Sequence, residues 1–325
     1  MNTKTWVFIL LLQFNFFIFC TSIDTITPTQ SIKDGDILVS TGETFALGFF
    51  SPGNSNRRYV GIWYYKISEQ TVVWVANRDS PINGTSGVLS LNQDGNLVIF
   101  DSNRNSTIWR TNASTVSYSA RLLDSGNLVL FQGDGGVVWQ SFDHPTNTML
   151  PNMKIGLDRR NGGGWSLTSW KSRDDPATGE YSYGVEDSES PEVVILKAGS
   201  TRVWRTASLF DVDRVAVSKP DATPALFNGT YVNNRDEAYG SYTMLVVGRV
   251  CYSVHGVDGQ AHCRYILSDG VGGLLESLPY EFGGGGHGLF AVFDPDLFRE
   301  LHSSGGVGSV VGDGVFDGVD CLEGR

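Results

Sequence analysis

Three neighbouring side chains carry the functional groups of a serine hydrolase: Ser141, Asp143 and His144. A nucleophile, a base and an orienting carboxylate work together when distant segments of a chain bring them to one shaped pocket. Here the three lie side by side on one stretch of chain. Asp175, next to another aspartate and before Pro176, is more simply part of a turn. We therefore predict no catalytic residue.

A second group of reactive side chains lies near the C-terminus, in the series Cys251-x3-His255-x6-His262-Cys263. This spacing matches none of the usual zinc fingers, and a disulfide is the simpler use of the cysteines outside the cell. The Gly306-Val-Gly308 run follows no convincing strand and opens no helix, which argues against a nucleotide-binding loop. We expect no metal and no cofactor.

The first residues have the pattern of an export signal. Lys4 gives a short positive region, an apolar run extends from Trp6 to Cys20, and small residues follow, so cleavage is expected after Ser22. The alternative, a membrane anchor, is disfavoured because the run is shorter than the roughly 20 residues that a spanning helix needs. No later segment is long and apolar enough to span a bilayer, and we expect a secreted, extracellular (apoplastic) protein.

Cysteine use and charge narrow the expected partners. Cys20 leaves with the signal, so an odd number of cysteines remains, Cys251, Cys263 and Cys321, and one thiol is free or pairs outside the chain. The net charge of −11, from 24 basic and 35 acidic residues, argues against nucleic acid as a partner. Four Asn-x-Ser/Thr sequons behind an export signal predict a glycoprotein, with acceptors at Asn83, Asn105, Asn112 and Asn228.

The chain up to about residue 200 has the pattern of an all-β protein. Short runs rich in Val, Ile, Phe, Tyr and Trp alternate with polar turns, which favours a sandwich, barrel or prism. The expected strands are Tyr59–Tyr65, Thr71–Ala76, Val88–Leu91, Asn96–Asp101, Thr107–Arg110, Ala120–Leu123, Asn127–Phe131 and Val137–Gln140.

These runs also repeat. Asn96-Leu-Val-Ile-Phe100 returns as Asn127-Leu-Val-Leu-Phe131, and each follows a glycine turn and precedes a tryptophan with an apolar neighbour. The tryptophans are Trp109 and Trp139, and a third such element surrounds Trp74. Because no copy can bury its own face, three copies predict three small sheets about a common axis. We expect the three tryptophans in the shared interior.

Several motifs resemble the bulb-type lectin domain of S-locus glycoproteins and G-type lectin receptor kinases. The resemblance covers about residues 23–205, with a patchier part at 227–245, and it implies a β-prism of three four-stranded sheets. The motifs are Thr44-Phe-Ala-Leu-Gly-Phe-Phe-Ser-Pro-Gly53, Val60-Gly-Ile-Trp-Tyr64, Val73-Trp-Val-Ala-Asn-Arg-Asp79, Asp94-Gly-Asn-Leu-Val98, Trp139-Gln-Ser-Phe-Asp-His-Pro-Thr-Asn-Thr148 and Gly164-Trp-Ser-Leu-Thr-Ser-Trp-Lys-Ser172.

The resemblance implies a mannose site of the pattern Gln-x-Asp-x-Asn-x-Val-x-Tyr. Spacing by two places these side chains on one face of a strand. A carboxylate and amides would hold sugar hydroxyls, and the valine would pack on ring carbons. The best copy is Asn92-x-Asp94-x-Asn96-x-Val98-x-Phe100. Its centre is intact, but Asn92 is one methylene shorter than Gln and Phe100 lacks the phenol oxygen.

The other two copies depart further from the pattern. The second, Leu123-x-Ser125-x-Asn127-x-Val129-x-Phe131, keeps only the Asn and the Val. The third, placed by its distance to Trp74, is Gly61-x-Trp63-x-Tyr65 and has no Asn. An alternative stays open for the first two series, because Asp94-Gly95 and Ser125-Gly126 are good hairpin turns in their own right.

The expected organisation is a signal at 1–22, a bulb-type lectin domain at 23–145, a second lectin-like or S-locus glycoprotein segment at 146–245, and a divergent, glycine-rich, irregular tail at 246–325. The family would continue into a growth-factor-like module, an apple-type module and, in receptors, a membrane helix and a kinase. After Trp204-Arg205 this chain departs from the family pattern, and beyond about 246 none of these parts is recognisable.

These observations predict a secreted, non-catalytic recognition glycoprotein. The resemblance implies a mannose-type glycan or a receptor-kinase ectodomain as partner, with a role in pollen recognition or defence. Family ectodomains dimerise, so a dimer is an open expectation. Two alternatives remain: a secreted hydrolase on a β scaffold, and a non-functional truncated receptor-kinase remnant.

Overall fold

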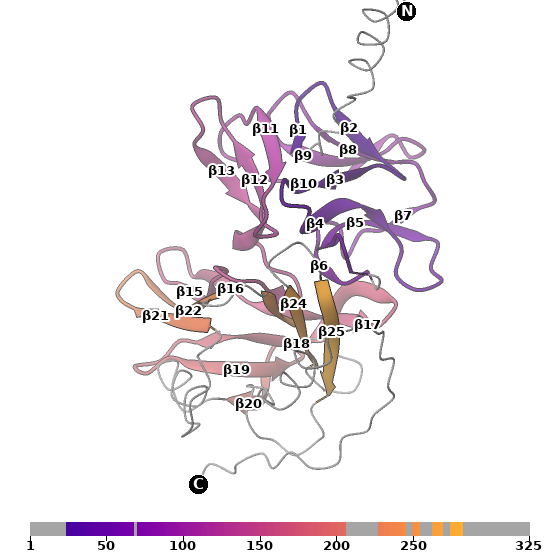
Figure 1. Ribbon diagram of the computed structural model, residues 1–325. Helices are drawn as coiled ribbons and strands as arrows, with labels where there is room; N and C mark the ends of the chain where they lie inside the picture. Colours follow the sequence, from indigo (N-terminus) through magenta and orange to yellow (C-terminus); the bar gives the residue numbers. More distant parts are fainter. Residues whose placement is uncertain are drawn as a thin grey trace, which may run out of the picture.

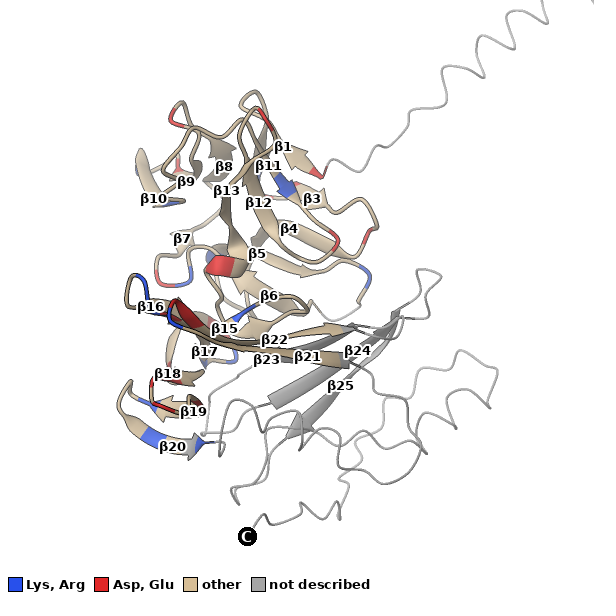
Figure 2. Ribbon diagram, turned by 90° about the vertical axis from the view of Figure 1, so that its left-hand side faces the viewer, with Lys and Arg blue, Asp and Glu red and all other residues tan. Residues whose placement is uncertain are grey.

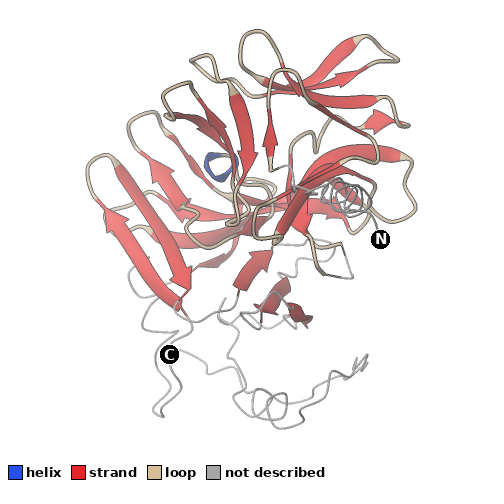
Figure 3. Ribbon diagram, turned by 45° about the horizontal axis from the view of Figure 1, so that its top comes forward, coloured by secondary structure: helices blue, strands red, loops and turns tan. Residues whose placement is uncertain are grey.

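The protein is built almost entirely of β-strands. The computed structural model describes residues 24–67, 70–205, 227–244, 249–253, 262–268 and 274–281. Within these residues, the helical structure is one 3₁₀ turn, η1, at Ser141–Asp143 (Figure 3). The expected export signal, Cys321, His255 and the Gly306-Val-Gly308 run lie outside the described residues.

The N-terminal part is a prism of three sheets, named here by the copy of the repeat that each contains (Figure 1). Sheet I has the order β10 (Ser106–Arg110), β9 (Leu97–Asp101), β8 (Gly87–Leu91), β2 (Ser31–Lys33). Sheet II has the order β1 (Thr25–Ile26), β11 (Ser119–Leu122), β12 (Leu128–Phe131), β13 (Val137–Gln140). Sheet III has the order β3 (Ile37–Val39), β4 (Phe45–Phe50), β5 (Arg57–Tyr64), β6 (Val72–Val75), and β7 (Ile82–Asn83) also pairs with β5.

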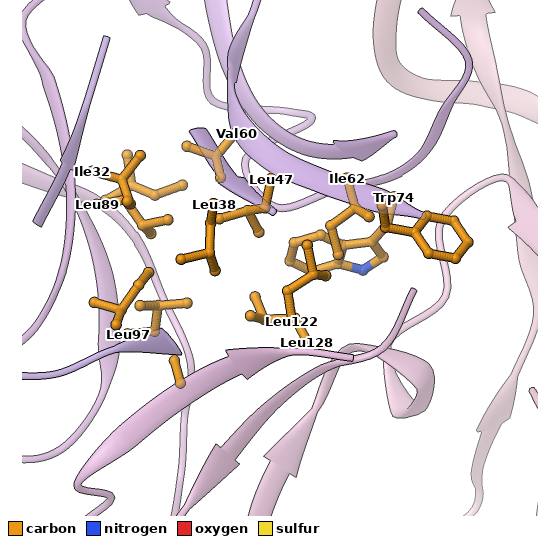
Figure 4. Close-up of a cluster of buried hydrophobic side chains, with 14 of the residues drawn as sticks. Ile32, Leu38, Leu47, Val60, Ile62, Trp74, Leu89, Leu97, Leu122 and Leu128 are labelled. Carbon is orange, nitrogen blue, oxygen red and sulfur yellow. The ribbon is translucent and has the colours of Figure 1, made fainter. Parts of the chain in front are cut away.

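Strand alternation fills the space between the three sheets with aliphatic side chains. In β9, Leu97 and Ile99 are fully buried, and β8 alternates buried and half-buried residues along its length. Each aliphatic side chain taken fully out of water contributes about 1.5–3 kcal/mol. Figure 4 shows how all three sheets direct side chains toward this core, which includes Ile32, Leu38, Leu47, Val60, Ile62, Leu89, Leu97, Leu122 and Leu128.

The three repeated tryptophans meet where the sheets converge. The ring centroids of Trp74 and Trp109 are 6.0 Å apart, and Trp139 lies 6.2 Å from each of them. The ring planes are inclined by 68–76°, the edge-to-face arrangement that aromatic quadrupoles favour. The predicted interior position is confirmed for Trp74 and Trp139, which are buried, whereas Trp109 is half-buried and packs against the same core. The predicted threefold β-prism is confirmed.

The C-terminal part also contains three four-stranded sheets. Their orders are β14 (Thr148–Met149), β23 (Arg249–Ser253), β24 (His262–Ser268), β25 (Leu274–Glu281); then β16 (Gly163–Trp165), β15 (Ile155–Asp158), β22 (Glu237–Met244), β21 (Phe227–Asn233); and β17 (Leu167–Ser172), β18 (Asp175–Glu186), β19 (Glu192–Lys197), β20 (Thr201–Arg205).

The expectation of an irregular tail from residue 246 is wrong for three segments. β23, β24 and β25 are strands, and β23 pairs with β14 through Thr148↔Ser253 and Met149↔Tyr252. The sheet therefore crosses the boundary that composition suggested. The glycine content concealed short runs of β-branched, aromatic and leucine residues that are long enough to pair.

The two parts are joined by a packed contact on the outer face of sheet III. Trp170 of β17 stacks on Phe50 of β4 with ring centroids 6.5 Å apart, inside a buried cluster that also holds Tyr59 and Trp63. The face that a free prism would show to solvent is here covered by the C-terminal part.

Two polar residues after β6 fix this contact. The Arg78 guanidinium donates hydrogen bonds to four carbonyl oxygens: those of Ser169 at 2.6 Å, Pro176 at 2.9 Å, Thr168 at 3.2 Å and Ala177 at 3.4 Å. Asp79 accepts from the backbone N–H and the hydroxyl of Thr178 at 2.7 and 2.8 Å. Burial lowers the pKa of Arg78, and the neighbouring Asp79 carboxylate opposes that effect.

Candidate functional site

The first repeated series begins with a hairpin that uses its own polar side chains. The Gly95 N–H donates to the Asn92 carbonyl oxygen at 3.0 Å, and Gly95 has a φ of +74°, which favours glycine. The Asn92 amide oxygen accepts from the Asn96 N–H at 2.8 Å. Asn92 therefore closes the turn. The Asp94 carboxylate is exposed and, among the described residues, receives one long contact of 3.4 Å from the Asn92 amide nitrogen.

Asn96 has one half of its amide occupied and the other half open. The residue is 8% exposed. Its oxygen Oδ1 accepts from the Thr111 hydroxyl at 3.1 Å and from the Ala113 N–H at 3.0 Å, which ties the segment after β10 to the start of β9. Among the described residues none accepts a hydrogen bond from Asn96 Nδ2. The fixed oxygen leaves the nitrogen oriented and available as a donor.

The second series repeats this network with one difference. Asn127 Oδ1 accepts from the Ser141 hydroxyl and from the Phe142 N–H, both at 3.2 Å. Asn127 Nδ2, however, donates to Gln140 Oε1 at 2.9 Å, and Gln140 Nε2 donates in turn to Asp143 Oδ2 at 3.1 Å. The donor that stays open at Asn96 is taken at Asn127.

Strand register explains the difference between the two copies. In sheet II, Gln140 is paired with Val129, which puts an amide acceptor close to Asn127. In sheet I the corresponding partner of Val98 is Arg110, which offers only donors. Arg110 is exposed. The residue after each repeated tryptophan therefore decides whether the asparagine donor is available.

The third series is placed differently from the sequence-based alignment. Ile99, Leu130 and Ile62 are the residues that pair with the three tryptophans, so Tyr59 occupies the Asn96 position and Gly61 the Val98 position. The alignment by distance to Trp74 was wrong by two residues, because the connection after β5 differs in length from the connections after β9 and β12. The conclusion that this copy has no asparagine is unchanged.

The apolar end of the first series is partly covered. Val98 is 9% exposed, and Phe100 is half-buried between its strand neighbours Val88 and Thr107. In the second series Val129 is buried, and Phe131 is half-buried beside Val137. Around these positions the strands of the prism carry little charge, and the charged residues gather at strand ends and loops (Figure 2).

The three faces of the N-terminal prism are thus used in three ways. Sheet I presents an exposed carboxylate at Asp94 and an open amide donor at Asn96. Sheet II satisfies its asparagine internally through Gln140. Sheet III is covered by Trp170. The sequence pattern located the asparagines, but the roles of Arg110, Gln140, Thr111 and Ser141 were missed. Their signal is their position, one and two residues after Trp109 and Trp139.

The triad-like residues have structural partners. The Ser141 hydroxyl donates to Asn127 Oδ1 and accepts from the Leu128 N–H at 2.9 Å. The His144 ring stacks on Trp139 at 5.2 Å, and burial lowers the pKa of His144 while the Asp143 carboxylate raises it. These contacts place Ser141 in the repeat network and His144 against the aromatic interior.

Other expected features are described in part. The four sequon asparagines, Asn83, Asn105, Asn112 and Asn228, are all exposed. Cys251 and Cys263 lie on the adjacent strands β23 and β24. In the part of the chain that the structure describes, no three His, Cys, Asp or Glu residues gather as metal ligands, and no helix could cross a membrane.

Comparison with known proteins gives consistent results. Residues 71–171 match the family described as D-mannose binding lectin. The chain is 45% identical over 255 residues to the G-type lectin S-receptor-like serine/threonine-protein kinase RKS1 of Arabidopsis thaliana, covering 77% of this chain and 30% of that protein. It is 44% identical over 202 residues to the corresponding kinase B120 of the same plant, covering 59% and 24%.

Among solved structures, a monomeric mannose-binding lectin from Gastrodia elata is 20% identical and covers 36% of this chain and 96% of its own, with a TM-score of 0.28. Against the Arabidopsis kinases, this chain spans less than a third of their length.

Proposed function

Because this chain carries a bulb-type lectin domain and is related over most of its length to the G-type lectin S-receptor-like kinases, we propose that it is a non-catalytic recognition protein. Its ligand is a mannose-type glycan bound on the outer face of sheet I. The observation that carries the proposal is the open donor Asn96 Nδ2 beside the exposed Asp94 carboxylate. The same donor is occupied in sheet II.

The chemistry of this face suits a neutral sugar. The Asp94 carboxylate accepts hydrogen bonds from hydroxyl groups, Asn96 Nδ2 donates to a hydroxyl oxygen, and Val98 packs against ring carbons. Arg110 stands next to Val98 across the strand pair and adds donors at the rim. A few hydrogen bonds worth about 1 kcal/mol each give a weak site with a dissociation constant near the millimolar range.

The setting of this recognition is extracellular in our proposal. The export-signal pattern and the four exposed sequons support a secreted glycoprotein. A role in pollen recognition or in defence is the corresponding biological proposal, and it rests on the resemblance to the S-locus and G-type lectin families.

A receptor-kinase ectodomain is the second candidate partner. It is favoured by an apolar surface at sheet II, where Tyr118 is 59% and Val137 is 56% exposed. Both flank Phe131: the Tyr118 N–H donates to the Phe131 carbonyl oxygen at 2.8 Å, and Val137 pairs with Phe131 across the strands. Such a patch suits a protein interface better than a hydroxyl-rich sugar.

The test is glycan-array binding of the mature chain with two matched variants. Asn96→Asp keeps the oxygen that holds Thr111 and Ala113 but removes the Nδ2 donor. Asn127→Asp makes the same change in sheet II, where the donor serves only Gln140. We expect mannose-selective binding by the wild type and by Asn127→Asp, and its loss in Asn96→Asp.

The two variants separate a sugar site from a structural role. Equal loss of binding in both would show that the substitution acts through the fold. Silence from the wild-type array, with circular dichroism confirming a folded β-protein, would refute the glycan proposal and direct the search to protein partners through Tyr118 and Val137.

A further inference from the structure

A depression lies between sheets I and III, away from the proposed sugar face. It has a volume of about 610 Å³, within the range of roughly 300–1,000 Å³ typical of small-ligand sites. One side is formed by the start of β5 and by β7, and the other by the β9–β10 hairpin, whose labels appear in Figure 1. The lining residues are Arg57, Ser80, Pro81, Asn83, Arg104, Thr107 and Ile108. Asn96 precedes β9 and Arg104 follows it, so the depression and the proposed sugar face lie at opposite ends of this strand.

The charged residues that line this depression are basic, although the chain as a whole is acidic. The chain has a net charge of −11, yet both charged residues of the lining are arginines, Arg57 and Arg104. Their side chains are 53% and 54% exposed. Because each arginine is paired with an aspartate, an anion would be held here by the remaining guanidinium donors rather than by a net positive charge.

Each arginine has N–H donors that its ion pair with the protein does not use. Arg57 Nη1 contacts Asp175 at 3.2 Å, and Arg104 Nε lies 3.6 Å from the buried carboxylate of Asp101. A guanidinium carries five N–H donors in a planar fork that matches a carboxylate. Each ion pair involves one nitrogen, and Arg57 also interacts with the Tyr59 side chain, which leaves further donors of each guanidinium for a ligand.

The rest of the lining fits a sugar ring better than a bare ion. Ser80 and Thr107 supply hydroxyl groups, and Pro81 and Ile108 supply an apolar surface for ring carbons. Asn83, a predicted glycosylation acceptor, supplies its amide when it carries no glycan. We propose that this depression binds a carboxylate-bearing saccharide, of the uronic-acid class, with Arg57 and Arg104 holding the carboxylate. The site is separate from the neutral-sugar face, and its test does not depend on the function proposed above.

The probe is tri-galacturonic acid, measured by titration calorimetry on the mature chain at low ionic strength. Two sequons border the depression, so every protein carries Thr85→Ala and Asn105→Gly to prevent an attached glycan from occupying it. Thr85→Ala keeps the Asn83 side chain, and Asn105 has a φ of +52° that glycine accepts readily. The variants are Arg57→Gln, Arg104→Gln and the double change. Arg121→Gln, an exposed ion-paired arginine on sheet II, is the matched control.

We expect the wild-type background to bind the acid and not its methyl ester, which keeps the shape and loses the charge. Each single arginine change weakens binding about tenfold or more, as expected for the loss of a charge-assisted hydrogen bond. The double change abolishes binding. A further variant, Arg57→Lys, binds more tightly than Arg57→Gln but less tightly than the wild-type background, and Arg121→Gln binds as the wild-type background does. Absence of binding in the wild-type background, retention in a folded double variant, or equal loss in Arg121→Gln would each overturn the proposal.

Discussion

Arg78 makes four hydrogen bonds across the contact between the N-terminal prism and the C-terminal part, which makes it an informative residue for a stability test. Replacing Arg78 with methionine keeps most of the side-chain volume and removes every donor. The carbonyl oxygens of Ser169 and Pro176, which receive its shortest hydrogen bonds at 2.6 and 2.9 Å, lose a charged partner. The carbonyl oxygens of Thr168 and Ala177 lose weaker contacts.

The expected cost follows from these bonds. A hydrogen bond to a charged group contributes about 1.5–3 kcal/mol, so the two short bonds give about 3–6 kcal/mol. Removing the guanidinium also relieves its own desolvation in the native state, which offsets part of this sum. We expect Arg78→Met to weaken the association of the two parts by about 2–4 kcal/mol.

Guanidinium denaturation followed by tryptophan fluorescence measures the effect, because Trp63 and Trp170 lie in the contact. The wild type should unfold in one transition, and Arg78→Met should separate it into two as the prisms uncouple. Arg121→Met, at an exposed ion pair, should stay within about 0.5 kcal/mol of the wild type. A single unchanged transition in Arg78→Met would refute the expectation that the Arg78 hydrogen bonds couple the two parts.

Two further predictions concern the N-terminal prism. Gly95→Ala should destabilise the protein by about 2 kcal/mol or more, because its φ is +74° and the new Cβ would lie 2.2 Å from the Ser117 nitrogen. Gly135→Ala, with a similar φ of +85° and open space, should cost only about 1 kcal/mol in the same denaturant titration, and equal costs would contradict the packing argument. The hydrogen bond from the Ser86 hydroxyl, together with bonds from the Asn103 and Arg104 N–H groups, holds the pKa of Asp101 below its ordinary 3.8 although burial opposes this. Because the folded-state pKa is the lower one, the stabilisation is complete above about pH 5 and is lost as the pH falls through 3.8 and below. Asp101→Asn should therefore lower Tm at neutral pH, and the difference from the wild type should shrink in acid; a constant difference would exclude titration of Asp101 as the cause.

The threefold prism was predictable because its signals are local and repeated. The Asn-Leu-Val runs, the glycine turns and the three tryptophans recur with nearly constant spacing, and each copy has one apolar face to bury. Strand alternation then assigns Leu97 and Ile99 to the interior and Asn96 and Val98 to the outer face without further information.

What the sequence could not supply depends on contacts across strands and between prisms. The occupation of the Asn127 donor depends on Gln140, which the register of β12 and β13 brings alongside. The register of the third copy depended on the length of the connection after β5, which spacing alone misjudged. The burial of sheet III depends on Trp170, far away in the sequence. The strands β23–β25 were hidden because glycine-rich segments surround them in the sequence. Their partner in the sheet, β14, lies far before them in the chain.

The unequal use of the three prism faces bears on valency. A symmetric prism could hold three sugars and gain retention from each, whereas here one face stays open, one is satisfied by its own glutamine and one is covered by Trp170. Under the function proposed above, each chain would offer one weak sugar site that releases its ligand quickly, so we expect stable attachment to a surface to require several copies held together or a dense field of ligands. Effective concentration, which can raise apparent affinity by about 10²–10⁴-fold, then sets the response. On that proposal, we expect the density of mannose-type glycans on a surface to determine how strongly the protein attaches to it.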